Sequence, residues 1–501
     1  ISRVEMKYFG LVFLLITSAV SAEAVPRFAK IFADHAVLQR EKPISIFGSG
    51  AEPGSKIEVQ FGGEIYSAMI VEDGKWRANI PALVASDEGR RLELRENGVV
   101  TQTIADVVVG DVWLAAGQSN MQFRVSGMLK GLPETKAWID GADRNQIRFR
   151  RVDDKVLAER NSEVTELATP EKWAVMTPVT VLNFSAVAAV FAFEIERELD
   201  VPVGIIDVSW GGKPIEPFIP REAFATPFLE EIRNLADAEK LDELAKLRGG
   251  VIIRNPQGYP GAIFNARMAL LPSFGVRGFL WYQAESNAGT GEDPREYRHK
   301  MAALFSGWRG RWQDEALPCY FVQLPSYPPA TGWIRVREEQ RRALEIPNTG
   351  MAVVIDLPGD DIHPPMKIPV GNRLARLALA GTYQRKNIVA SGPMFQKFEV
   401  DGEAAEVSFS GTDGGLKISN GDELKWFELT GGDGVWHSAK AKIKGEQVFV
   451  KSDAVSNPVA VRYACATNPR GGNLVNGAGL PASPFCSDLE MLPWVDPPKK
   501  K

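Results

Sequence analysis

The chain has 501 residues, of which 45% are hydrophobic and 24% charged, and this composition is close to that of average soluble proteins. It excludes a disordered chain, a collagen and a coiled coil, and the length predicts about three domains. The 58 basic and 63 acidic residues leave a formal charge of −5, so there is no excess of cations to bind a nucleic-acid backbone. We therefore expect no nucleic acid among the partners.

Residues 1–24 have the pattern of a secretory signal peptide. Lys7 precedes a ten-residue apolar run, 11–20, and small residues follow as far as Ala22 and Ala24, the two expected cleavage points. The run is too short to span a bilayer, and no later run reaches that length. The pattern predicts a secreted or periplasmic protein without a membrane span.

Residues 25–106 form short predicted strands separated by turn residues. Apolar and polar residues alternate over 43–47, 56–61 and 76–80, and glycine-rich turns lie between these runs. This pattern predicts an N-terminal β module that resembles a small sandwich.

Apolar strand runs alternate with helical patterns over residues 107–386. A helix is predicted over Ala186–Leu199, with Ser185 as its N-cap, and it leads into a strand over 203–208. Further strands are predicted at 112–116, 278–282, 319–324 and 351–357, and further helices at 229–247, 296–312, 336–344 and 370–383. This order predicts an α/β domain with a parallel sheet. The β-type alternation returns over 387–496 and predicts a C-terminal β module.

Three cysteines are present. Cys465 and Cys486 lie close together in a loop-rich stretch, and an oxidising compartment favours a bridge between them. Three reduced, buried thiols, including Cys319 beside an apolar run, are the alternative. No spacing of cysteine and histidine is typical of zinc, and we expect neither a metal nor a cofactor.

Histidine is scarce, and a serine nucleophile normally needs one as its base. Three of the four histidines have ordinary explanations, because two lie in the β modules and one in a charged helical pattern: His35, His437 and His299. His363 instead lies in the loop 358–365, after the strand predicted over 351–357. Ligands of an open α/β sheet bind beyond the carboxyl ends of its strands, so His363 is the candidate base. Either Asp360 or Asp361 is placed to orient its ring.

The same geometric argument identifies a candidate nucleophile. Ser119 lies in the sequence Gly-Gln-Ser-Asn-Met at 117–121, directly after the apolar run 112–116, and a glycine there permits a turn. The pattern is not the Gly-x-Ser-x-Gly elbow of α/β-hydrolases. Two further loops, 208–214 and 281–289, also follow apolar runs and offer N–H and amide donors of the kind that stabilise an oxyanion.

Four ordered blocks resemble the sialate O-acetylesterase family, whose members are carbohydrate esterases of the SGNH-hydrolase class. They are Gly-Gln-Ser-Asn-Met at 117–121, Ser-Trp-Gly-Gly at 209–212, Trp-Tyr-Gln-Ala-Glu-Ser-Asn at 281–287 and Asp-Ile-His-Pro at 361–364. Segments 34–40, 458–463 and 480–485 are similar to that family as well, so the resemblance covers nearly the whole mature chain.

The resemblance implies a role for each matched residue. Ser119 would attack an acetyl ester, and His363 would take its proton and later deliver one to the departing sugar hydroxyl. The N–H groups of Ser119 and Gly211 and the side-chain amide of Gln283 or Asn287 would hold the oxyanion. The resemblance also implies a flavodoxin-like catalytic domain, with the two β modules on either side of it.

The chain departs from the family pattern at position 284, where alanine stands in place of the usual glycine; a positive φ there would strain the backbone. The choice between Asp360 and Asp361 stays open. Arg267 and Arg373 are of the type that binds a sialic acid carboxylate, but surface ion pairing is the expected role of both.

These patterns predict a serine esterase that deacetylates carbohydrate, with O-acetylated sialic acid as the first choice of substrate. An esterase acting on acetylxylan or another polysaccharide through the same centre is the first alternative. A carbohydrate-binding protein with a relict hydrolase centre is the second. The pattern leaves the oligomeric state open.

Overall fold

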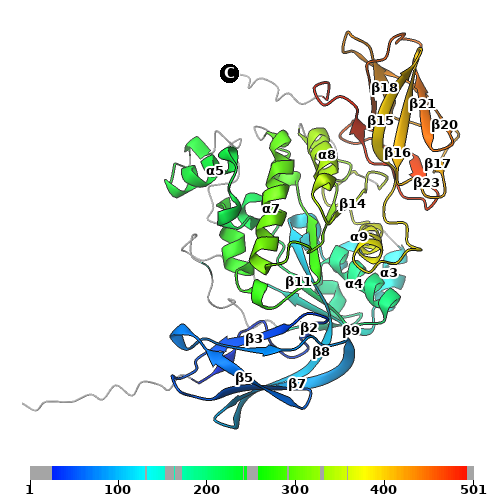
Figure 1. Cartoon of the computed structure of the whole chain (residues 1–501). Helices are drawn as coiled ribbons and strands as arrows, with labels where there is room; N and C mark the ends of the chain where they lie inside the picture. The colour runs from blue at the N-terminus through cyan, green and yellow to red at the C-terminus, as the bar shows by residue number, and fades with distance from the viewer. Residues whose placement is uncertain are drawn as a thin grey trace, which may run out of the picture.

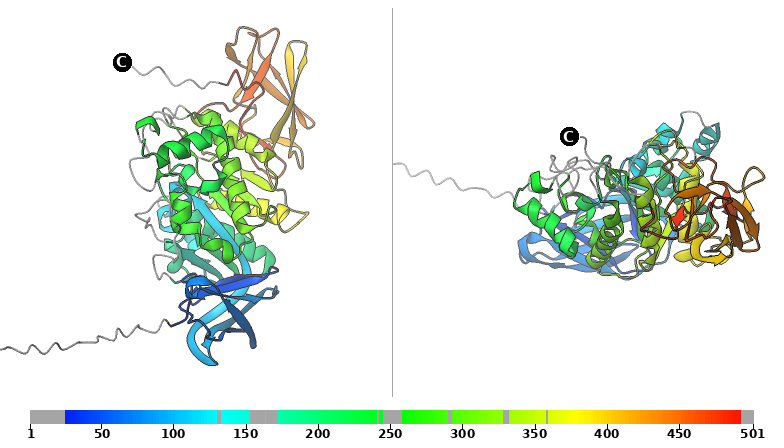
Figure 2. Two further views of the ribbon diagram at one scale, coloured as in Figure 1. Left: turned by 60° about the vertical axis from the view of Figure 1, so that its left-hand side comes forward. Right: turned by 90° about the horizontal axis from the view of Figure 1, so that it is seen from above.

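The computed structural model of the chain describes residues 25–129, 133–152, 163, 172–240, 242–244, 258–289, 293–327, 332–357 and 359–492. Two β regions lie at opposite ends of the molecule, with the helices gathered around a sheet between them (Figures 1 and 2). The predicted signal peptide lies outside the described residues. Within those ranges, no helix has both the length and the apolar character needed to cross a membrane.

The N-terminal region forms strands because apolar and polar residues alternate between its turns. Strand β6 (Trp76–Ile80) buries Trp76, Ala78 and Ile80 and exposes the residues between them. The other strands are β1 (Arg27–Phe28), β2 (Val37–Gln39), β3 (Ile44–Ser49), β4 (Ile57–Phe61), β5 (Glu64–Ile70), β7 (Ser86–Glu96) and β8 (Val99–Gly117). Their order is β1-β3-β6-β5-β4-β7-β8, with antiparallel neighbours, and β2 adds to β8 in parallel.

Strand β8 belongs to two parts of the molecule. Its first half pairs with β7, and the residues from Asp111 to Gly117 pair with strands of the central sheet. The domain boundary predicted between 106 and 107 lies inside this strand, so backbone hydrogen bonding continues across it. The strand that ends at the candidate nucleophile is therefore anchored in both regions.

The central sheet has the parallel order β9-β11-β8-β12-β13-β14, with β10 antiparallel at the edge beside β9. Its strands are β9 (Arg144–Arg151), β10 (Ala174–Met176), β11 (Val203–Asp207), β12 (Gly278–Tyr282), β13 (Cys319–Val322) and β14 (Thr349–Ala352). The predicted α/β character is confirmed. Strand β12 has the predicted bounds, and the structure ends β13 and β14 earlier than the apolar runs do.

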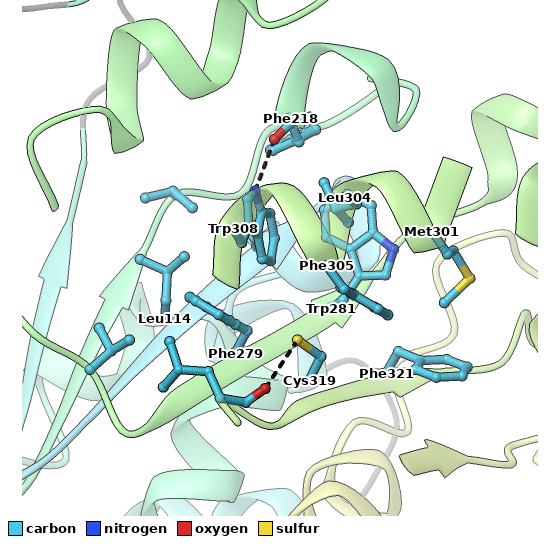
Figure 3. Packing of buried hydrophobic residues seen from close by; sticks show 14 of the residues in the cluster. Leu114, Phe218, Phe279, Trp281, Met301, Leu304, Phe305, Trp308, Cys319 and Phe321 are labelled. Atoms are coloured by element: carbon cyan, nitrogen blue, oxygen red, sulfur yellow. Dashed lines mark hydrogen bonds between the residues drawn. The ribbon is translucent and has the colours of Figure 1, made fainter. Parts of the chain in front are cut away.

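Helices cover both faces of this sheet because alternate residues of a strand point to opposite sides. Phe279 and Trp281 of β12 pack on Trp308 of helix α7 (Tyr297–Trp312), as Figure 3 shows. Leu280 and Tyr282 belong to the core on the other face, together with helices α4 (Ala186–Leu199) and α9 (Ile368–Gly381). A strand buried on both faces explains why its sequence is a continuous apolar run.

The helices follow the predicted patterns with shifted ends. Helix α4 (Ala186–Leu199) has the predicted bounds, and the Ser185 hydroxyl accepts a hydrogen bond from the Ala188 N–H at 3.3 Å, which confirms the N-cap. The helix predicted over 229–247 is interrupted, since α5 (Pro227–Asp237) ends at Asp237 and residues 242–244 are helical again; residues 241 and 245–247 lie outside the described ranges. The remaining helices are α1 (Ser119–Gln122), α2 (Val125–Met128), α3 (Pro133–Asp140), α8 (Trp333–Arg342) and α9 (Ile368–Gly381).

The C-terminal region contains three groups of strands. They are β15 (Met394–Asp401), β16 (Ala404–Ser410), β21 (Gln447–Lys451) and β20 (Lys440–Lys444); β17 (Leu416–Ile418) and β23 (Leu474–Asn476); and β19 (Trp436–Ser438), β18 (Phe427–Thr430), β22 (Ala460–Tyr463) and β24 (Phe485–Cys486). The predicted bridge between Cys465 and Cys486 is wrong for this structure, in which both thiols are free and buried. Each thiol donates to a backbone carbonyl instead, Cys465 to Phe485 and Cys486 to Asp488, both at 3.1 Å.

Candidate active site

The end of β8 places Ser119 beside the neighbouring strand β12. Gly117 has a φ of 135°, and a Cβ atom there would lie 2.1 Å from the carbonyl oxygen of Tyr282, so only glycine fits. The Gln118 N–H donates to the same carbonyl at 3.0 Å. The chain then turns into α1, and Ser119 is the first residue of this short helix.

His363 comes to Ser119 from a distant part of the chain. Its Nε2 lies 2.7 Å from the Ser119 Oγ, although the two residues are 244 positions apart in sequence. The meeting point lies where the strand order changes direction, since β11 and β12 flank β8 on opposite sides. Ligands of open α/β sheets bind at such a point, beyond the carboxyl ends of the strands. The structure therefore brings together the two residues predicted as nucleophile and base.

Among the described residues, neither predicted aspartate is hydrogen-bonded to the imidazole ring. Asp361 accepts a hydrogen bond from the His363 backbone N–H at 2.9 Å, and Asp360 forms an exposed ion pair with Arg470 of the C-terminal region. Within the described ranges, the ring's hydrogen bond is the one to Ser119. Asp361 thus holds the loop of His363 rather than its ring, and which carboxylate acts during the reaction stays a prediction.

The surroundings of His363 favour a neutral ring. Partial burial lowers the pKa of His363, and the nearby positive charge of Lys367 lowers it further, against an opposite effect of Asp361. A neutral imidazole can accept a proton, so these surroundings suit a base that works near neutral pH.

Gly211 lies against the nucleophile. A Cβ atom at this position would lie 3.6 Å from the Cβ of Ser119. The Gly211 N–H donates to the side-chain oxygen of Gln122 at 2.9 Å. The Gly211 N–H, which the family resemblance assigns to the oxyanion, is therefore bonded to Gln122 in this structure. A substrate oxygen would have to displace the Gln122 side-chain oxygen to accept this hydrogen bond.

Gln283 and Asn287 lie in a buried hydrogen-bond network that includes Gln118, the residue before Ser119. The Gln283 amide donates to Gln118 Oε1 at 2.9 Å and to Asn287 Oδ1 at 2.8 Å, and Tyr297 donates to its oxygen. Asn287 also donates to Glu216 at 3.3 Å. These bonds tie together the loops that follow β8, β11 and β12. An oxyanion role for the two amides stays a prediction.

Ala284 has the backbone conformation that the family glycine implied. Its φ is 149° and its ψ −15°, a region that residues with a Cβ rarely adopt. Such strain costs about 1–3 kcal/mol and gathers at functional sites.

We expect Ala284→Gly to raise the free energy of unfolding by about 1 kcal/mol, because the relief of strain exceeds the entropy that glycine loses on folding. Chemical denaturation measures the change. Ala288→Gly is the matched control, since Ala288 is also buried but has an ordinary φ of −106°, and its replacement should destabilise the protein. An Ala284→Gly variant that is destabilised as much as this control would contradict the assigned strain.

A cleft of about 360 Å³ opens at the Ser119–His363 pair. Besides these two residues, its lining includes Phe123, Arg124 and Arg151 together with Gln122. Sequence reasoning missed both arginines. Arg124 follows the nucleophile by five residues, which was a usable signal, whereas Arg151 stands at the end of an arginine-rich strand that is typical of a solvated sheet edge.

Arg267 and Arg373, the arginines weighed above against a substrate carboxylate, do not line this cleft. Arg267 is buried, donates to the carbonyls of Val208 and Ser209, and stacks over Trp210 with its guanidinium 3.9 Å from the ring centre. Arg373 pairs with Asp356 at 2.7 Å. The expected ion pairing is confirmed for Arg373, whereas Arg267 binds backbone carbonyls instead.

Comparison with known proteins connects this geometry to a family. A family model described as carbohydrate esterase, sialic acid-specific acetylesterase, matches residues 109–380. The sialate O-acetylesterase of Mus musculus is 26% identical over 96% of this chain and 98% of its own length, and that of Rattus norvegicus is 28% identical over 78% and 80%. Among solved structures, a carbohydrate acetylesterase from Xanthomonas citri is 32% identical, with a TM-score of 0.82 over 93% of this chain and 100% of that one.

Proposed function

Because this chain belongs to the carbohydrate esterase family of sialic acid-specific acetylesterases and is a carboxylic ester hydrolase, we propose that it deacetylates O-acetylated sialic acid through an acetyl-enzyme at Ser119. The observation that carries the proposal is the 2.7 Å contact between Ser119 Oγ and His363 Nε2 at the carboxyl edge of the sheet. A hydroxyl becomes an effective nucleophile when a neighbouring base removes its proton.

The proposed reaction has two halves. Ser119 Oγ forms a bond with the acetyl carbon as His363 takes the hydroxyl proton, and the bond from that carbon to the sugar oxygen then breaks as the imidazolium returns the proton to the sugar. Water, activated by the same ring, attacks the acetyl-serine and releases acetate. The backbone N–H groups of Ser119 and Gly211 would stabilise the oxyanion after the carbonyl oxygen displaces the Gln122 side chain, and each such donor contributes about 3 kcal/mol.

The charge of the cleft supports an anionic sugar as substrate. Arg124 is exposed and Arg151 half-buried, and both line the cleft with the nucleophile. A guanidinium forms charge-assisted hydrogen bonds with a carboxylate, which sialic acid carries and acetylated xylan does not.

We expect Arg124→Gln and Arg151→Gln each to lower kcat/KM for an O-acetylated sialic acid by about 10- to 100-fold, which corresponds to a lost charge-assisted bond of about 1.5–3 kcal/mol. Hydrolysis of an uncharged aryl acetate should change little. Arg197→Gln, on the exposed side of α4 and paired with Glu194, is the matched control. Equal losses on the charged and uncharged substrates would argue against carboxylate binding and favour the polysaccharide esterase.

Acetate release by the purified protein tests the proposed function as a whole. Release from O-acetylated sialic acid that exceeds release from acetylated xylan supports it, and the reverse order favours a polysaccharide esterase. A protein that frees no acetate from any acetylated sugar or aryl acetate would instead be a carbohydrate-binding relict.

We further propose that the central unit, over about 107–386, is a flavodoxin-like SGNH-hydrolase domain between two β-sandwich-like modules. The order β11-β8-β12-β13-β14 supports this, because it corresponds to the flavodoxin order 2-1-3-4-5. We also propose that the protein is secreted or periplasmic after cleavage of residues 1–24. N-terminal sequencing of the protein from an extracellular or periplasmic fraction tests the cleavage.

A further inference from the structure

A single side chain connects the nucleophile loop to the histidine loop. Asn120 directly follows Ser119, is fully buried, and donates from Nδ2 to the carbonyl of Ile362 at 2.9 Å. Ile362 directly precedes His363. The two halves of the Ser119–His363 pair are therefore joined by a hydrogen bond one residue away from each of them.

Two buried ionisable residues hold the Asn120 amide in place. Its Nδ2 donates to Glu285 Oε1 at 2.5 Å, and its Oδ1 accepts a hydrogen bond from the Lys367 ammonium. A carboxylate and a carbonyl can only accept and an ammonium can only donate, so these three partners allow one orientation of the amide. If the amide rotated, the bond to Ile362 would be lost.

Lys367 lies in a closed environment. It is 1% exposed, immediately before helix α9, and its Nζ lies 5.0 Å from the ring centre of Phe123 and 5.4 Å from that of Tyr282. Burying a lysine costs free energy unless partners compensate for the lost water. An ordinary role as a solvated surface charge therefore does not explain why Lys367 is buried beside the site.

We propose that Lys367 is a positioning residue: it fixes the Asn120 amide, which in turn holds the loop of His363 against Ser119. This inference rests on the proposed function, because it assigns a device that aligns the proposed nucleophile and base. It also explains how the His363 ring is held against Ser119 without a hydrogen bond from an aspartate in the described structure. In a catalytic triad the aspartate hydrogen bond orients the histidine ring. Here the hydrogen bond from Asn120 to Ile362 orients the backbone that carries His363.

The charge of Lys367 gives the proposal a second readout. The titratable groups that face it are Tyr282 of β12, Glu285 from the loop after β12, and Asp361 and His363 from its own loop. Burial lowers the pKa of Lys367 to about 7, against opposite effects of Glu285 and Asp361. The ammonium in turn lowers the pKa of His363, so removing it should raise that pKa and move the acid limb of kcat/KM to higher pH.

The test compares Lys367→Met, Asn120→Ala and the double variant in the full-length protein, with an aryl acetate as substrate. We expect each single variant to lower kcat at least tenfold with little change in KM. The double variant should be no slower than the slower single variant, since residues that act through one another are not additive. Lys367→Met should also shift the acid limb upward, and Asn120→Ala, which retains the ammonium, should shift it less.

Arg309→Met is the matched control. Arg309 is also buried and cationic, but it donates to the carbonyls of Leu317, Pro347 and Asn348, at the amino ends of β13 and β14. It should lower the melting temperature without moving kcat or the acid limb.

Three results would overturn the proposal: turnover within twofold of wild type in Asn120→Ala or in Lys367→Met, effects that multiply in the double variant, or an unmoved acid limb in Lys367→Met. The Asn120→Ala result stands by itself if Lys367→Met does not fold. Ser119→Ala distinguishes this inference from the proposed function. If Ser119→Ala is active, the proposed function fails; if it is inactive while both single variants keep wild-type turnover, the positioning role alone fails.

Discussion

Ser119→Ala and His363→Ala are each expected to lower kcat for acetate release at least about a thousandfold, because the two groups act as one unit. Without the imidazole the hydroxyl keeps its proton and is a weak nucleophile, and without the hydroxyl the imidazole has no nucleophile to activate. The 2.7 Å contact between Oγ and Nε2 makes each residue dependent on the other. Initial rates on an aryl acetate and on an O-acetylated sialic acid measure the loss.

The double variant should be no slower than the slower single variant, since the second substitution removes a partner that has already lost its function. Ser126→Ala is the matched control, because Ser126 is exposed on helix α2, seven residues beyond the nucleophile. It should retain the wild-type rate. Wild-type turnover in either Ser119→Ala or His363→Ala would refute the assignment, as would a double variant in which the two losses multiply.

The strands that carry the site could be predicted because parallel strands buried on both faces are continuous apolar runs. The bounds of β12 follow directly from the sequence, and Ser119 follows the end of such a run. The contact between Ser119 and His363 is harder to predict. Strands β12 and β13 separate β14 from β8, so the loop after β14 must return past both strand ends to reach the nucleophile.

The partners of the site residues could not be predicted, since they come from distant segments. Asp360 is adjacent to the histidine loop in sequence, yet it pairs with Arg470, which lies more than a hundred residues later. The Gln283 amide is bonded to Gln118 and Asn287, a choice that depends on how three loops pack. Lys367 had no distinguishing signal, because a lysine at the start of a helix is usually solvated.

Loss of the Asp111 carboxylate is expected to destabilise the protein strongly. It is fully buried in β8, and it accepts hydrogen bonds from Arg40 at 3.0 Å, Arg277 at 2.7 Å and the Tyr383 hydroxyl at 2.9 Å. These partners come from the N-terminal region, from the loop before β12 and from the segment after α9. Asp111→Ala leaves the guanidinium groups of Arg40 and Arg277 with the exposed Glu41 as their remaining carboxylate partner, and breaking a buried ion pair costs about 3–5 kcal/mol. Chemical denaturation at neutral pH measures this loss.

Asp237→Ala is the matched control. Asp237 pairs with Arg221 at the surface, where such pairs contribute less than about 1 kcal/mol. Equal losses of stability in Asp111→Ala and Asp237→Ala would show that β8 does not depend on its buried carboxylate.

The stability that Asp111 contributes should depend on pH in one direction. Burial alone would raise its pKa, but the hydrogen bond from Arg40 and the charges of Arg277 and Arg40 together lower it below the ordinary value. A carboxyl whose pKa is lower in the folded state stabilises the protein fully above its unfolded pKa of about 4, and this contribution is lost as the pH falls through the folded pKa. Asp111→Asn removes the titrating group and preserves the shape of the side chain. The free energy of unfolding of this variant should therefore fall less between about pH 6 and pH 3, where carboxylates titrate, than that of wild type. Parallel curves for the two proteins over that range would mean that Asp111 does not carry the pH dependence assigned to it.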